Sequence, residues 1–139
     1  MNRKAGFVIA FILFFLPPFF SNATTYLDQQ EFMSLDTAEK KYGSGSFDAL
    51  KFRTAKLNER AAMAVSLIRS KKYIGKLPND VKKDLGPYSG YFWSDSIPTY
   101  LVETSTDKAK GSWQLVFLID EQGAITEVKI HKNCCATSK

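Results

Sequence analysis

The sequence predicts a single α+β domain in which two helices pack on an antiparallel β-meander of three to four strands. Two observations support this fold class. Apolar residues recur three and four positions apart between residues 57 and 87, which is typical of amphipathic helices. After Pro87 the chain becomes rich in aromatic and β-branched residues, which favour strands. The globular domain is expected to span residues 57–133.

The first 23 residues are typical of a cleaved secretory signal peptide. Arg3 and Lys4 precede an apolar run over residues 5–20, and Ser-Asn-Ala at residues 21–23 offers a cleavage site. The run is shorter than the roughly 20 residues of a membrane-spanning helix. No cysteine lies near the cleavage site, so no lipid anchor is expected. The mature protein is predicted to be periplasmic or secreted.

The expected mature chain has the length of a single domain and a small positive net charge. Removing 23 of the 139 residues leaves 116, which is enough for one hydrophobic core. The signal peptide takes two of the 19 Lys and Arg, so 17 remain against 14 Asp and Glu and the net charge is +3. This small excess does not indicate nucleic-acid binding.

Residues 24–56 are polar and only weakly periodic, so they are expected to form a partly ordered N-terminal arm. One short helix is expected over residues 36–42, before the Gly-Ser-Gly-Ser sequence at residues 43–46. The first long helix is expected to be capped by Asn58 and to end near Lys71.

A second, shorter helix is expected to begin at Pro78 and to stop at the Gly86-Pro87 pair. Strands are expected over residues 99–104, 113–119 and 124–131. The middle strand is apolar on both faces, so it should be central and covered on both sides, with the helices over one of them. Residues 120–123, Asp-Glu-Gln-Gly, are expected to join the last two strands as a hairpin turn.

A family resemblance rests on the order of small, apolar and aromatic residues along the second half of the chain. The residues concerned are Gly75, Val81, Leu85, Gly86, Tyr100, Leu115, Val116, Phe117, Asp120, Gly123 and Ile125. This order resembles the BamE-like (SmpA/OmlA) family of small exported proteins, whose fold is shared with β-lactamase inhibitory protein. The resemblance implies two helices on an antiparallel sheet and a binding role without catalysis.

The chain departs from the pattern of that family in three places. Leu77 stands where the family has a capping Thr or Ser, and Pro87 comes one residue earlier than the family's proline. The lipid-anchoring cysteine of the assembly lipoproteins is also missing. The inference of the fold survives these departures, but the inference of membership in an outer-membrane assembly machine does not.

The sequence contains no motif that indicates a catalytic residue, a cofactor or a metal site. His131 is the single histidine, and at the end of a strand it is expected to be solvated. Cys134 and Cys135 lie in a C-terminal tail, residues 134–139. They could form a strained disulfide with each other, bridge to another chain, or belong to an inert tail. A redox or metal-binding role for this pair therefore remains one alternative.

Two groups of side chains are candidates for partner binding. Tyr88, Tyr91, Phe92 and Trp93 could anchor a protein interface, or they could roof the core between the second helix and the sheet. The second group includes Lys82 and Lys83, which could meet an acidic partner or an anionic envelope surface, or simply be solvated.

The expected function is that of an exported, non-enzymatic module that binds an envelope or secreted protein, as an assembly factor, inhibitor or immunity-type protein does. The alternative that uses the aromatic segment is a periplasmic small-molecule binder or hydrolase.

Overall fold

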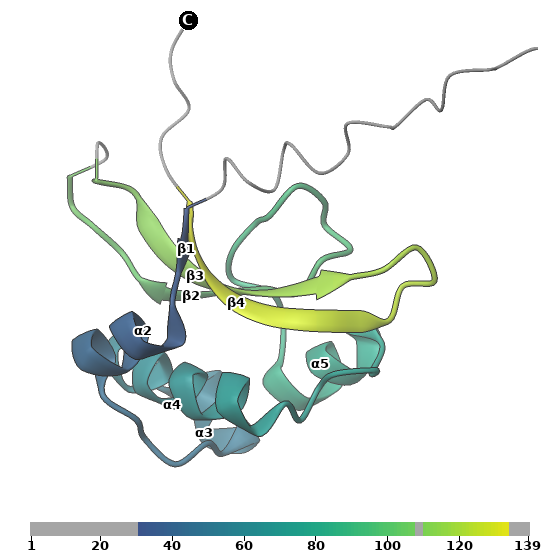
Figure 1. The fold of residues 1–139 in the computed structure, drawn as a ribbon, viewed down its shortest axis with the longest axis horizontal. Coiled ribbons are helices and arrows are strands. Elements are labelled where there is room, and N and C mark those ends of the chain that lie inside the picture. The colour runs from purple at the N-terminus through teal and green to yellow at the C-terminus, as the bar shows by residue number, and fades with distance from the viewer. Residues whose placement is uncertain (1–30, 108–109, 134–139) are drawn as a thin grey trace, which may run out of the picture.

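The computed structural model describes residues 31–107 and 110–133. The expected signal peptide, residues 24–30 and the Cys134–Cys135 pair therefore lie outside the described residues. Within the described part of the chain, four helices cover one face of a four-stranded sheet (Figure 1). The elements are β1 Phe32–Met33, α2 Leu35–Tyr42, α3 Ala49–Thr54, α4 Leu57–Ser70, α5 Pro78–Leu85, β2 Thr99–Glu103, β3 Ser112–Ile119 and β4 Ile125–Asn133.

The sheet is antiparallel throughout and has the order β1-β4-β3-β2. Strands β2, β3 and β4 form the expected meander, and β1 adds a fourth strand by pairing Phe32 with His131 and Met33 with Ile130. In the hairpin between β3 and β4, Asp120 Oδ1 accepts hydrogen bonds from the backbone N–H groups of Gln122 and Ala124. The α+β fold class predicted from the sequence is confirmed.

The hydrophobic core lies between the helices and the sheet, and aromatic rings fill its centre. Phe52, Tyr73, Tyr100 and Phe117 are all buried, and Tyr100 makes edge contacts with Phe52 at 5.7 Å and with Phe117 at 6.1 Å. Tyr73 also meets Phe117 edge-on at 5.7 Å. Edge-to-face packing of this kind stabilises aromatic clusters beyond their burial.

The segment before α4 contains more structure than the single short helix expected from the sequence. Besides α2, it forms the strand β1 and the helix α3. Side chains cap both helices, because Ser34 accepts from Thr37 N and Asp48 accepts from Lys51 N. Each helix also has a buried residue in the core, Ala38 in α2 and Phe52 in α3. The segment is thus part of the packed helical layer.

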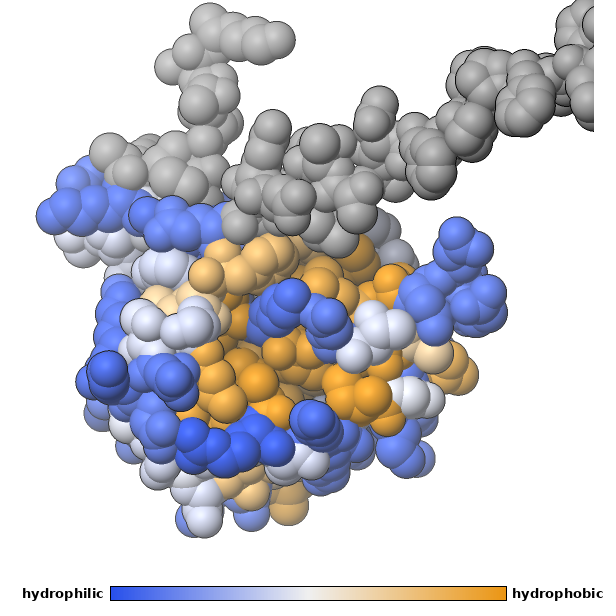
Figure 2. Space-filling model, in the orientation of Figure 1, coloured by the Kyte–Doolittle hydropathy of each residue, from blue (hydrophilic) through white to orange (hydrophobic). Residues whose placement is uncertain are grey.

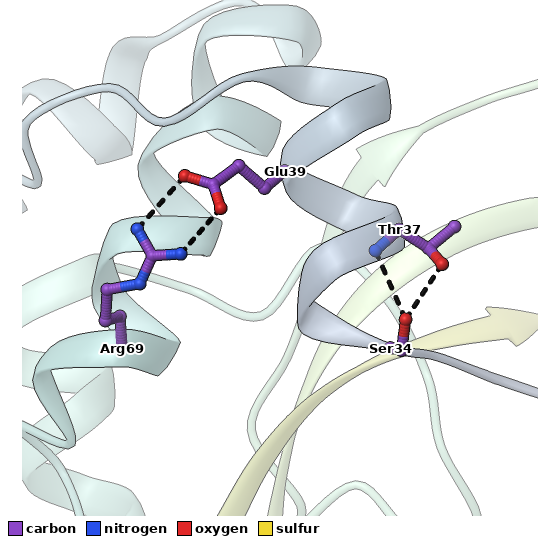
Figure 3. A network of polar contacts seen from close by, with 4 residues as sticks. All are labelled: Ser34, Thr37, Glu39 and Arg69. Atoms are coloured by element: carbon purple, nitrogen blue, oxygen red, sulfur yellow. Dashed lines mark hydrogen bonds and ion pairs between the residues drawn. The ribbon is translucent and has the colours of Figure 1, made fainter.

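An ion pair joins α2 to α4 across the surface of the helical layer. The Arg69 guanidinium donates two hydrogen bonds to the Glu39 carboxylate, at 3.1 and 2.7 Å (Figure 3). The bonded Arg69 lowers the pKa of Glu39 from its usual value. The same view shows the Ser34 cap at the start of α2, so this helix is held both at its N-terminus and at its middle.

The two helices that the sequence predicted most directly, α4 and α5, are both present. Helix α4 begins at Leu57 with Lys56 as its N-cap, so the expected cap at Asn58 is wrong by two residues. The Glu59 carboxylate accepts from Lys56 N and so takes the capping role at this end of the helix. Helix α5 spans Pro78–Leu85, as expected, and the Asp80 carboxylate accepts from Leu77 N at its start.

None of the helices among the described residues is both long and apolar enough to cross a bilayer.

Candidate protein-binding loop

The segment between α5 and β2, residues 87–98, crosses the face of the sheet that the helices leave open. We call it the aromatic loop, because it carries Tyr88, Tyr91, Phe92 and Trp93. Figure 1 shows this loop rising on the side of the sheet opposite the helices. The central strand β3 is therefore covered on both faces, as the sequence predicted. Val116, on the face that the loop covers, is fully buried.

Backbone hydrogen bonds fasten both ends of the aromatic loop to the sheet. The N–H groups of Ser89 and Gly90 donate to Thr99 O at 3.1 and 3.0 Å, and Phe117 N donates to Pro98 O at 3.0 Å. Gly90 lies so close to the sheet that a Cβ there would come within 2.7 Å of Gln114 Oε1. A glycine at this position is what allows the loop to approach the strands.

The buried side chain of Gln114 holds the middle of the aromatic loop. Its Oε1 accepts from Tyr91 N at 3.3 Å, and its Nε2 donates to Tyr91 O at 2.8 Å. Gln114 is only 1% exposed, so these bonds have little competition from water. No sequence pattern had singled out Gln114 as a candidate residue. The available signal was a single amide within the otherwise apolar run of β3.

Phe92 packs down onto the same face of the sheet, beside His131. Its ring lies 4.7 Å from the His131 ring and 6.3 Å from the Phe32 ring. His131 is only 6% exposed, so the expectation of a solvated histidine is wrong. The reason is that β1 and the aromatic loop close over the end of β4 from two sides. Burial lowers the pKa of His131, and the nearby Glu31 carboxylate partly opposes this shift.

Tyr91 and Trp93 point outward from this anchored loop. They are 55% and 54% exposed, among the most exposed large hydrophobic side chains described. The Tyr91 hydroxyl donates to Trp93 O at 2.8 Å, which closes a tight turn at the tip. Trp93 adopts φ of 61°, a left-handed conformation that costs energy for any residue other than glycine.

The four candidate aromatic residues thus occupy three different environments. Tyr88 is half-buried between α5 and the sheet, with its ring 5.7 Å from Tyr100 and its hydroxyl bonded to Pro78 O. Phe92 is buried on the opposite face, and Tyr91 and Trp93 are exposed. Tyr88 therefore covers the core, whereas Tyr91 and Trp93 are each more than half exposed.

The two candidate lysines face different surfaces of α5. Lys82 lies over the Tyr88 ring, with Nζ 5.6 Å from the ring centre. It lines a hollow of about 430 Å³ that also includes Leu77, Tyr88 and Asp95. Lys83 lines another hollow, of about 410 Å³, whose other residues are Lys72, Tyr73, Lys76, Asp80 and Asp84. Only Lys82 is therefore brought next to the aromatic loop.

A further apolar surface is lined by residues of α4, the turn after it and β4. Figure 2 shows apolar side chains gathered on this face and rimmed by hydrophilic ones. Ile68, Ile74 and Val128 line a hollow of about 380 Å³ there, with Lys71 and Lys129 at its rim. This surface is separate in sequence from the aromatic loop, and it was not predicted from the sequence.

Over residues 31–107 and 110–133, no group of three or more His, Cys, Asp or Glu side chains is placed to hold a metal ion. No protein-family model, curated protein or solved structure matches this chain.

Proposed function

We propose that this chain is an exported, non-enzymatic module that binds a protein of the cell envelope through the aromatic loop. The observation that carries the proposal is the combination of exposed Tyr91 and Trp93 with a backbone fixed by buried Gln114. Tyrosine and tryptophan supply much of the binding energy at protein interfaces. A loop that is already ordered loses little entropy when a partner binds.

The conformation of Trp93 gives independent support for this proposal. A left-handed backbone at a large non-glycine residue persists only where the surroundings impose it, and such residues cluster at functional sites. Here the Tyr91 hydroxyl bond to Trp93 O and the stacking of Trp93 on Phe92, at 6.1 Å, hold the conformation in place. The result is an indole that remains 54% exposed to solvent at the tip of the loop.

The proposed location and class of the protein rest on the sequence. The signal-like residues 1–23 support a location of the mature chain, residues 24–139, in the periplasm or outside the cell. The resemblance to BamE-like proteins favours an assembly factor, an inhibitor or an immunity-type protein. Lys82 would favour a partner with an acidic surface near the loop, because complementary charge speeds association, and Lys83 would add to the positive charge farther along α5.

The test is capture of a partner by the mature chain from an envelope extract of the source organism. We expect a stoichiometric protein partner that is retained by the wild type and lost with Trp93→Ala. Leu50→Ala is the matched control, since Leu50 is 72% exposed but lies on α3 in the helical layer. Equal capture by the wild type and both variants, or capture of no protein at all, would contradict the proposed function.

A further inference from the structure

The hydrogen bonds of Gln114 fix which way round its amide lies. Its oxygen faces the N–H of Tyr91, and its amino group faces the C=O of Tyr91. The amino group is also the atom that lies 3.3 Å from His131 Nδ1. Since an amide nitrogen can only donate, Nδ1 must accept this hydrogen bond. His131 is therefore neutral in this arrangement, with its proton on Nε2.

We propose that His131 and Gln114 form a pH-sensitive latch, which holds the aromatic loop on the sheet while His131 is neutral and releases it when the imidazole is protonated. The two residues are cross-strand neighbours in β4 and β3. The latch regulates the surface named in the proposed function, but its operation within the chain does not depend on a partner.

Protonation of His131 sets two donors against each other. The new N–H at Nδ1 would point at the amino group of Gln114, which has no lone pair to offer. Rotating the Gln114 amide by half a turn would supply its oxygen to His131. The same rotation would then place the amino group against Tyr91 N–H and remove the hydrogen bond to Tyr91 O. In either case Gln114 loses hydrogen bonds, to His131 in β4 or to Tyr91 in the loop. The site is buried, and an unpaired polar group is costly there.

The aromatic contacts around His131 tie the latch to the exposed side chains. The imidazole packs between Phe32, at 5.2 Å, and Phe92, at 4.7 Å. Phe92 lies between Tyr91 and Trp93 in the sequence and stacks on Trp93. A charged imidazole is poorly solvated by this apolar cage. Movement of Phe92 away from His131 would admit water and would displace both exposed aromatic residues with it.

The charged groups around His131 do not cancel this effect. Glu31, just before β1, favours the protonated form, but its carboxylate is paired with Lys132 at 2.9 Å. Lys129, on the same face of β4, lies over the Phe32 ring at 5.2 Å, and its charge is balanced by the Glu127 carboxylate, 2.5 Å away. The aromatic loop contributes the titratable group of Tyr91, whose hydroxyl is turned to Trp93 O. Gln114 is the neutral contact from β3.

The experiment is an NMR titration of the mature chain, residues 24–139, from about pH 8 to about pH 5. His131 is the single histidine, so the imidazole signal reports its protonation without ambiguity. We expect the backbone amides of Tyr91, Phe92 and Trp93 to shift and lose order at the midpoint of His131, below its usual pKa of about 6.5. The amides of the β3–β4 hairpin should stay unchanged.

Two variants separate the latch from other effects of acid. His131→Leu should keep the loop amides constant over the whole pH range, because no imidazole remains to be protonated. Gln114→Leu should give the wild type's acid spectrum for the loop already at neutral pH. If His131→Leu fails to fold, the wild-type titration and Gln114→Leu decide the question.

Three results would overturn the latch. The loop amides could stay constant through the midpoint of His131, the whole domain could unfold together at that midpoint, or Gln114→Leu could keep the loop closed at neutral pH. None of these measurements includes a partner, so failure of the latch is distinct from failure of the proposed function, which capture at neutral pH tests.

Discussion

Two buried polar residues, Gln114 and His131, determine what covers the face of the sheet away from the helices. Alternation along β3 places Gln114 on that face together with Val116, and the strand register sets His131 directly opposite Gln114. The sequence showed the alternation but not the register. Without the register, a lone glutamine and a lone histidine have no reason to be neighbours, so the anchor of the aromatic loop could not be predicted.

The lowered pKa of His131 predicts a pH dependence of stability with a definite sign. Below its unfolded pKa of about 6.5, the unfolded chain takes up a proton that the folded chain does not. The free energy of unfolding should therefore fall as the pH drops from neutral towards the folded pKa. Urea unfolding at about pH 7.5 and about pH 5.5 measures this change.

His131→Leu is the control for this measurement, because it removes the titrating group from both states. Its free energy of unfolding should change less than that of the wild type between the two pH values. A wild type that gains stability on acidification, or that changes just as the variant does, would show that burial of His131 is not the cause.

At the scale of helices and strands, the sequence predicted those elements that repeat a pattern often enough to be recognised. Helix α4 has 14 residues and helix α5 begins with Pro78, and both were expected. Helix α3 has six residues and strand β1 has two, which is too few for periodicity to show. Ser34 and Asp48 cap α2 and α3, but neither cap was predicted from the sequence. Short helices of this kind depend on tertiary packing more than on local pattern.

Helix α3 offers a matched pair of substitutions that tests this packing. Phe52 is fully buried in the aromatic core, so Phe52→Ala should lower the free energy of unfolding by about 3 to 5 kcal/mol. Leu50 lies on the same helix at 72% exposure, so Leu50→Ala should change it by less than about 0.5 kcal/mol. Chemical denaturation of both variants gives the comparison. Equal effects would mean that α3 is not part of the packed layer.

At the scale of the whole molecule, the fold is a sheet with helices on one face and an anchored loop on the other. The switch of residue types at Pro87 was enough to predict the fold class. Which aromatic side chains of this segment are buried and which are exposed was not predictable, because Tyr88, Phe92 and Trp93 have similar apolar character. Which of them is exposed depends on the path of the loop, and that path is set by Gly90 and Gln114 far apart in the sequence.

The most direct test of the proposed binding surface is the dissociation constant of the captured partner for the wild type, Trp93→Ala and Leu50→Ala. We expect Trp93→Ala to weaken binding by at least about tenfold, as the loss of an aromatic anchor does. Leu50→Ala should leave the dissociation constant unchanged, and the free energy of unfolding of Trp93→Ala should match that of the wild type, since the indole is exposed. Equal affinity of the wild type and Trp93→Ala would contradict the proposal that the aromatic loop is the binding surface.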